Sequence, residues 1–178
     1  MKNTINIITV ILIAAMAAVS SCTDLESYSE IPKVKFLKVF TADTTDTIGN
    51  KVIYQDIYLQ VIDGDGNLGL TRDDNEKDSS NLTIDFQKKV DGKYIRAFDS
   101  IPKFRIPYKQ PIGQNKYLRA EVKVNFTIPK IKVNYDTIRY KIHVRDRAQN
   151  TSDTVITCDI PIRWNGTVYA DGSTEENK

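Results

Sequence analysis

Alternation of apolar and polar residues is the feature that most constrains what this chain can fold into. In the longest stretch, 118–126, every second residue is apolar, and Arg119, Glu121, Lys123 and Asn125 stand between them. Shorter stretches with the same period lie at 34–36, 57–61, 82–86, 138–144 and 156–162. A period of two puts successive side chains on opposite faces of a strand, so each stretch predicts a strand with one buried face.

Turn signals separate these strands, among them Gly49-Asn50, Asp91-Gly92 and the segments 63–66, 111–115 and 146–150. Antiparallel strands with one apolar face bury it by packing two sheets together. We therefore predict a single all-β domain over 33–164, an antiparallel two-sheet sandwich of the immunoglobulin-like type, with a jelly roll as the alternative. The side chains expected to point inward are Ile84, Phe86, Val122, Val124, Ile142, Val144 and Ile160. Segment 165–178 has few apolar residues and is predicted to be a flexible tail.

The N-terminus resembles a bacterial lipoprotein signal peptide and is set aside from the fold. Lys2 precedes an apolar run over 5–19, which is shorter than the roughly 20 residues that a membrane-spanning helix needs. The run ends in Val-Ser-Ser-Cys at 19–22, and this resembles the lipoprotein box. The resemblance implies cleavage after residue 21, acylation of Cys22 with chains such as palmitate, and a lipidated tether over 22–32.

The residues after Cys22 bear on which membrane carries the anchor. Thr23 stands where an Asp would resemble the signal that retains enterobacterial lipoproteins in the inner membrane. Asp24 and Glu26 resemble the acidic signal that exports Bacteroidota lipoproteins to the cell surface. We expect an outer-membrane lipoprotein on the periplasmic or the surface face, with the surface favoured.

Three further segments together resemble a family of uncharacterised Bacteroidota outer-membrane or surface lipoproteins with an Ig-like sandwich. They are IDGDGNLGL at 62–70, IGQNKYL at 112–118 and VRDRAQNTS at 144–152. The last also resembles the Asp-x-x-Gly-Asn hairpin of bacterial Ig-like modules, with Gln149 in place of Gly. The family has no assigned activity, so the resemblance implies a fold and a cellular location only.

The segment after the second long strand carries a candidate calcium site. Asp63, Asp65 and Asn67 alternate, and Asp74 stands at the twelfth position of the loop. Calcium takes six to eight oxygen ligands, and this D-x-D-x-N spacing can present three side-chain oxygens to one centre. The sixth position is Leu68 and not the Gly of an EF-hand, and no flanking helices are predicted. The alternative is a turn, in which the aspartates accept backbone hydrogen bonds.

The sequence offers few residues for catalysis, and we expect no enzyme. His143 is the only histidine and falls on the polar phase of its strand, whereas Cys158 falls on the apolar phase. The formal charge of +2 excludes the strongly basic surface that non-specific nucleic-acid binding needs. We expect a non-catalytic interaction or accessory module of an envelope protein complex, anchored to the membrane. A glycan-binding surface lipoprotein, using tyrosines and Trp164, is the alternative.

An Asp followed by Thr or Ser recurs and resembles the O-glycosylation sequon of exported Bacteroidota proteins. The candidate glycosylated residues are Thr44, Thr47, Ser100, Thr137 and Thr154. The same tripeptides are also typical of strand entry, where an Asp closes the turn and β-branched residues begin the strand.

Overall fold

The computed structural model describes residues 28–71, 80–110 and 116–177, so the signal peptide, Cys22 and Asp74 lie outside the described residues. The elements are β1 (Lys33–Thr45), β2 (Lys51–Asp63), β3 (Leu82–Val90), β4 (Lys93–Arg96), β5 (Lys103–Phe104), β6 (Leu118–Pro129), the 3₁₀ turn η2 (Lys130–Lys132), β7 (Thr137–Val144), β8 (Val155–Ile156), β9 (Ile160–Pro161), β10 (Gly166–Tyr169) and β11 (Thr174–Glu176). Within these ranges no helix is long and apolar enough to cross a membrane.

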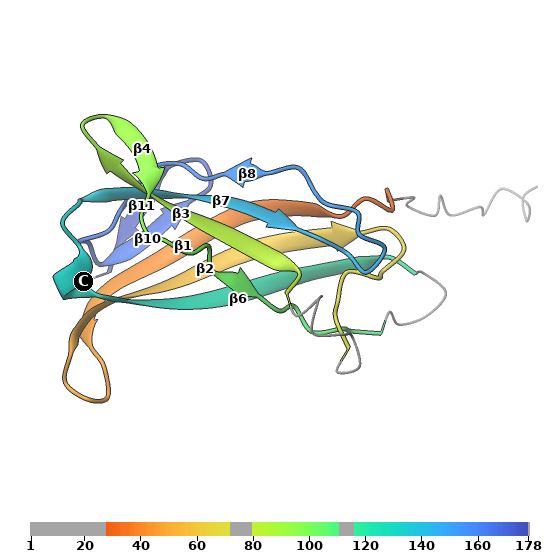
Figure 1. The fold of residues 1–178 in the computed structure, drawn as a ribbon, viewed down its shortest axis with the longest axis horizontal. Helices are drawn as coiled ribbons and strands as arrows, with labels where there is room; N and C mark the ends of the chain where they lie inside the picture. Colours follow the sequence, from red (N-terminus) through yellow and green to blue (C-terminus); the bar gives the residue numbers. More distant parts are fainter. Residues whose placement is uncertain (1–27, 72–79, 111–115, 178) are drawn as a thin grey trace, which may run out of the picture.

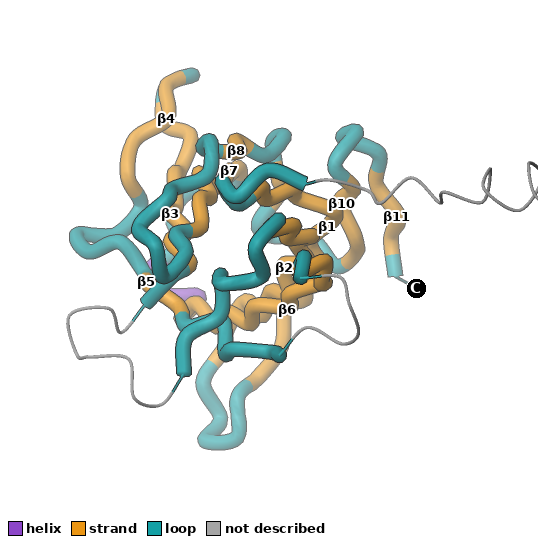
Figure 2. Tube along the Cα trace, turned by 90° about the vertical axis from the view of Figure 1, so that its right-hand side faces the viewer, coloured by secondary structure: helices purple, strands orange, loops and turns teal. Residues whose placement is uncertain are grey.

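The strands form two antiparallel sheets that pack as two layers (Figures 1 and 2). One sheet has the order β11-β10-β1-β2-β6, and the other has β4-β3-β7-β8, with β5 paired to β3 and β9 to β7. The predicted antiparallel β-sandwich is confirmed. Within it, β1, β2 and β6 lie side by side in one sheet, and β4, β3, β7 and β8 lie side by side in the other.

The alternating residues of β2, β3 and β7 form the core between the sheets. Ile57, Leu59, Ile84 and Ile142 have no exposed surface, as the period of two predicts. One polar chain crosses the core: the Tyr140 hydroxyl donates to Gln55 Oε1 (2.5 Å), and Gln55 Nε2 donates to Thr41 Oγ1 (3.0 Å). These buried polar groups satisfy one another and fix how the two sheets sit together.

The predicted burial is incomplete at one place, and the predicted inward phase fails at another. Val122 on β6 keeps its phase but is only half-buried, because it lines a groove together with Leu82 and Phe104. Ile156 was expected to face inward, but 51% of it is exposed. Thr157 is buried instead, with its N–H donating to the Tyr140 carbonyl (3.0 Å) and its Oγ1 accepting from the Tyr140 N–H (3.0 Å). The single strand predicted over 156–162 is therefore split into β8 and β9, and the face that points inward changes between them.

The prediction of a flexible tail over 165–178 is wrong for most of that segment. β10 pairs with β1, placing Val39 opposite Val168, and β11 pairs with β10. Val168 has no exposed surface, so a single apolar residue anchors the added hairpin to the core. The domain therefore extends beyond Trp164, and its first strand begins at Lys33 as predicted.

Candidate functional site

The loop after β2 crosses the end of the sandwich between the two sheets. Asp63, the last residue of β2, accepts a hydrogen bond from the Leu68 N–H at its Oδ2 (2.8 Å). Asp65 accepts from the Asn67 N–H at Oδ1 (3.3 Å) and from the Asn67 amide at Oδ2. Gly66 has a φ of 69°, a conformation that glycine adopts without strain. The hydrogen bonds expected for a turn are therefore present.

A buried asparagine that the sequence analysis missed holds the far end of this loop. Asn81 Nδ2 donates to the carbonyls of Leu68 (2.6 Å) and Ile106 (3.2 Å), and its Oδ1 accepts from the Ile106 N–H (2.6 Å). Leu70 forms a further parallel bridge with Pro107. This polar side chain ties the loop to the segment after β5, so the position of Asp63 to Asn67 is set from both sides.

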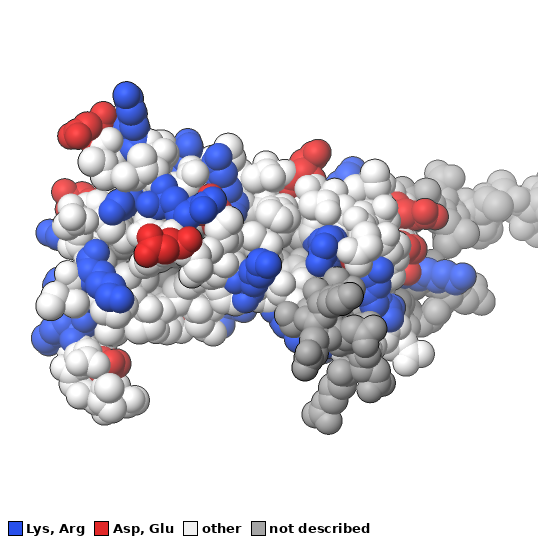
Figure 3. All heavy atoms as spheres, in the orientation of Figure 1, with Lys and Arg blue, Asp and Glu red and all other residues white. Residues whose placement is uncertain are grey.

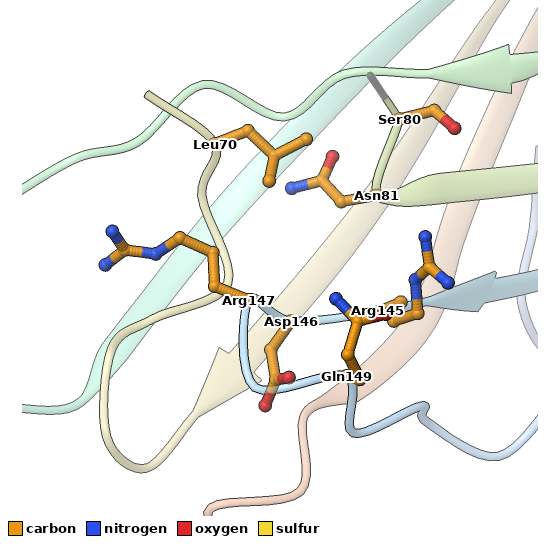
Figure 4. A pocket seen from close by; sticks show the side chains of 7 residues that line it. All are labelled: Leu70, Ser80, Asn81, Arg145, Asp146, Arg147 and Gln149. Atoms are coloured by element: carbon orange, nitrogen blue, oxygen red, sulfur yellow. The ribbon is translucent and has the colours of Figure 1, made fainter. Parts of the chain in front are cut away.

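The turn after β7 approaches the same end of the sandwich from the other sheet. The Asp146 N–H donates to the Asn150 carbonyl (3.0 Å), and its carboxylate accepts from the Asn150 N–H (2.7 Å) and side-chain amide (2.8 Å). Gln149 has a φ of 71°, in the left-handed region. Figure 4 shows the Asp146 carboxylate directed away from Leu70 and Asn81, and the Arg147 side chain extending to another side.

The structure brings the loop and the turn together. One carboxylate oxygen from each of Asp63, Asp65 and Asp146 lies within 4.8 Å of the other two. The Arg147 Nε also donates to the Asn67 carbonyl (3.1 Å) and so joins the two segments. We call Asp63, Asp65, Asn67 and Asp146 the acidic cluster. Three members were predicted from the sequence, whereas Asp146 was not recognised as a possible ligand.

The carboxylate of Asp63 is in an unfavourable environment for a negative charge. Asp63 has no exposed surface, and Asp146 is 2% exposed. Burial, followed by the charges of Asp65 and Asp146, raises the pKa of Asp63 to about 6, against the opposing effect of the Leu68 N–H. Asp63 Oδ1 and Asn67 Oδ1 are both buried and have no hydrogen-bond partner among the described residues. Buried polar atoms of this kind are uncommon in folded proteins.

His143 and Cys158, the residues considered for catalysis, do not belong to the acidic cluster. His143 is half-buried on β7, and burial and the charge of Arg145 lower its pKa. Cys158 packs against the core, its Sγ lies 3.4 Å from the Tyr169 carbonyl oxygen, and burial raises the pKa of its thiol. Neither side chain has a hydrogen bond to an acid or base among the described residues, so no nucleophile–base pair is formed there.

The candidate glycosylation residues differ in accessibility. Thr44, Thr47, Ser100 and Thr154 are exposed, and Thr137 is half-buried at the start of β7. Exposure permits modification of the first group without demonstrating it.

A groove of about 710 Å³ runs along β6 and the segment that follows β5. β6 is the end strand of its sheet and pairs with β2 on one side only within the described part of the chain. The groove is lined by Leu82, Phe104, Arg105, Ile106, Pro107, Lys109, Leu118, Arg119, Ala120, Glu121, Val122, Lys123, Val124 and Asn125. Figure 3 shows Lys and Arg side chains spread across the face of the molecule that is visible in the orientation of Figure 1.

Comparisons with known proteins add no identification. No protein-family model matches the chain, and neither the curated proteins nor the solved structures contain a significant match.

Proposed function

We propose that this protein is a non-catalytic, lipid-anchored interaction module of an outer-membrane or cell-surface complex. We further propose that it binds an extended, acidic segment of a partner protein along β6. The observation that supports this proposal is the groove beside the edge of that strand that pairs with no other described strand. An edge strand offers backbone N–H and C=O groups to which an extended peptide can add as a further strand.

The floor of the groove is apolar and incompletely covered. Leu118, Ala120 and Val122 on β6 are half-buried, whereas Leu59 and Val61, their neighbours on β2, have no exposed surface. Side chains of an added strand would cover this apolar surface. Removing this apolar surface from water favours the complex, and the cost of ordering the partner offsets part of that gain.

The charges at the groove favour an acidic partner. Among the described residues, Arg105, Lys109, Arg119 and Lys123 line it, and Glu121 is the only acidic residue in that part of the lining. Lys123 also pairs with Asp56 (3.3 Å), and Arg105 donates to the Thr71 carbonyl, so Lys109 and Arg119 are the stronger candidates for contact with a partner. Complementary charge of this kind speeds association and selects against cationic partners.

Photo-cross-linking in intact cells tests the interaction. A photoreactive residue at Val122 should cross-link to one envelope protein, within an acidic segment identified by mass spectrometry. The double variant Arg119→Glu and Lys109→Glu should abolish the product. Lys33→Glu and Lys35→Glu, on exposed positions of β1, form the matched control and should leave the product unchanged. A cross-link to a second copy of this chain, or to no protein, would contradict the proposal.

The proposed anchor is tested separately, because Cys22 lies outside the described residues. Metabolic labelling with an alkyne fatty acid should mark the native protein and fail to mark Cys22→Ala. The variant should also move from the membrane fraction to the soluble fraction. Label retained on Cys22→Ala would show that the anchor is elsewhere.

The glycan-binding alternative has less support from the described residues. Trp164 packs against the core, and the guanidinium of Arg139 covers the ring of Tyr94 at 3.7 Å from its centroid. These rings are therefore not displayed together as an open platform for a sugar.

A further inference from the structure

We propose that the acidic cluster is a calcium-binding site whose ligands are Asp63, Asp65 and Asn67 from one sheet and Asp146 from the other. This proposal goes beyond the interaction function and does not depend on it. It differs from the sequence-based candidate because the fourth ligand comes from the turn after β7.

The spacing of the oxygens fits calcium. Calcium–oxygen distances are about 2.3–2.6 Å, so two ligands on opposite sides of the ion lie about 4.6–5.2 Å apart. The carboxylate oxygens of Asp63, Asp65 and Asp146 lie within 4.8 Å of one another. One ion can therefore contact all three without a large rearrangement of the backbone.

Two unpartnered oxygens point independently to a missing ligand. Asp63 is fully buried, yet its Oδ1 accepts no hydrogen bond from a described residue, and the same is true of the buried Oδ1 of Asn67. The other oxygen of Asp63 is occupied by the Leu68 N–H. The hydrogen bonds of the turn thus shape the loop and leave one oxygen on each of these side chains for an ion.

The charges within the cluster lead to the same conclusion. Three carboxylates lie together, and none of them forms an ion pair with a described residue. Arg147 is the cationic residue whose hydrogen bond joins the loop and the turn. Its guanidinium, however, lies over the Tyr108 ring at 4.7 Å from the centroid, and its Nε donates to the Asn67 carbonyl. A divalent cation would neutralise charge that the protein leaves uncompensated.

The donor set favours calcium over magnesium. All four side chains offer oxygen, and calcium accepts six to eight oxygens in irregular arrangements, including carbonyls and water. Magnesium demands a near-ideal octahedron with bonds of about 2.0–2.1 Å. Asp65 is the most accessible of the three acids and leaves a side open to water. The ion would bind the loop after β2 to the turn after β7 and hold the two sheets together at this end.

Isothermal titration of the purified full chain with CaCl₂, after removal of metals with a chelator, tests the proposal. We expect one calcium ion per chain and a melting temperature that rises with millimolar calcium, because the ion binds only the folded state. Asp146→Asn should weaken calcium binding at least tenfold and abolish the rise. Asp46→Asn is the matched control, since Asp46 occupies an equivalent turn at the other end, and it should leave calcium binding unchanged.

Two further variants keep the test decisive. Asp65→Asn, at the accessible side, should also weaken binding at least tenfold, and it remains informative if Asp146→Asn fails to fold. Asp74→Asn should leave the affinity unchanged. The proposal is overturned by a flat titration of the native chain, by equal effects of Asp146→Asn and Asp46→Asn, or by loss of binding in Asp74→Asn alone. Equal affinity for magnesium would overturn the assignment to calcium.

Discussion

Two turns with the same local geometry lie at opposite ends of the sandwich. The Asp46 N–H donates to the Asn50 carbonyl (2.9 Å), and its carboxylate accepts from the Asn50 N–H (2.8 Å) and side-chain amide (2.9 Å). Asp146 and Asn150 make the same three bonds at 3.0, 2.7 and 2.8 Å. The residue before each Asn is left-handed, Gly49 in one turn and Gln149 in the other.

The surroundings of the two turns differ completely. Hydrogen bonds from the Asn50 side chain and backbone lower the pKa of Asp46, at the surface between β1 and β2. Asp146 is buried beside Asp63 and Asp65, and the pKa of Asp63 is raised. The five-residue motif therefore determines the turn, whereas its neighbours in the fold determine whether it can hold an ion.

The largest expected effect is that replacing Asp by Asn changes the free energy of unfolding in opposite directions at the two ends of the sandwich. In chelator at pH 7.5, Asp63→Asn should raise the free energy of unfolding by about 1–3 kcal/mol, because it removes a buried charge near two like charges. The amide oxygen can still accept from the Leu68 N–H, and the amide N–H₂ can donate to the neighbouring carboxylates. Asp46→Asn should instead lower the free energy of unfolding, because it removes a charged acceptor from the turn. Urea unfolding of both variants measures the difference.

Excess calcium supplies the control for this prediction. The gain from Asp63→Asn should then reverse, since the native protein is stabilised by the ion and the variant is not. A loss of stability in Asp63→Asn under chelator would contradict the idea that the acidic cluster is electrostatically unfavourable without a cation.

A smaller effect on the free energy of unfolding is expected from substitution of the left-handed residue in each turn. Gly49→Ala should cost about 1–2 kcal/mol, because a left-handed conformation is strained for any residue with a Cβ. No atom lies within 4 Å of the added Cβ, so backbone strain is the only cause. Gln149→Gly should raise the free energy of unfolding by up to about 1 kcal/mol for the same reason. Thermal unfolding gives both values, and effects of the same sign would show that the turns are not equivalent.

The smallest effect is a local change in titration at the exposed turn. Asn50→Ala should move the pKa of Asp46 upward toward its ordinary value of 3.8. A lowered pKa means that the folded state favours the charged carboxylate. Its stabilising effect is present above pH 3.8 and is lost as the pH falls through the folded-state pKa. Carbon-13 NMR titration of the Asp46 carboxyl group measures the shift, and an unchanged pKa would exclude Asn50 as its cause.

The strands were predictable because alternation reports directly on burial. Ile57 and Leu59 on β2 and Ile142 on β7 belong to the predicted stripes and have no exposed surface. The alternation could not reveal that Thr157 replaces Ile156 inside, because that change depends on hydrogen bonds with Tyr140 on a neighbouring strand. Nor could it reveal β10, whose buried side chain Val168 lies in a mainly polar segment.

The acidic cluster was predictable only in part. The D-x-D-x-N spacing identified Asp63, Asp65 and Asn67, and the turn motif identified Asp146 separately. A signal that links them was available in the predicted fold. In Ig-like sandwiches, the loop after the second strand and the loop before the last strand meet at one end. The predicted Ig-like type of sandwich could therefore have placed Asp146 beside the loop from the sequence alone.

A close backbone contact determines where the chain enters the domain. The Gly64 N–H donates to the Ser29 carbonyl (2.9 Å), and a Cβ on Gly64 would lie 2.3 Å from the Tyr28 carbonyl oxygen. The chain therefore enters the domain beside the acidic cluster. Six residue steps separate Cys22 from Tyr28, a reach of at most about 20 Å.

If Cys22 carries the lipid, that end of the sandwich faces the headgroups. The 13 residues of β1 then carry the chain roughly 40 Å along the sandwich toward the Asp46–Asn50 turn. The β6 groove lies along the flank between these ends, so a partner would approach parallel to the bilayer and not from above it.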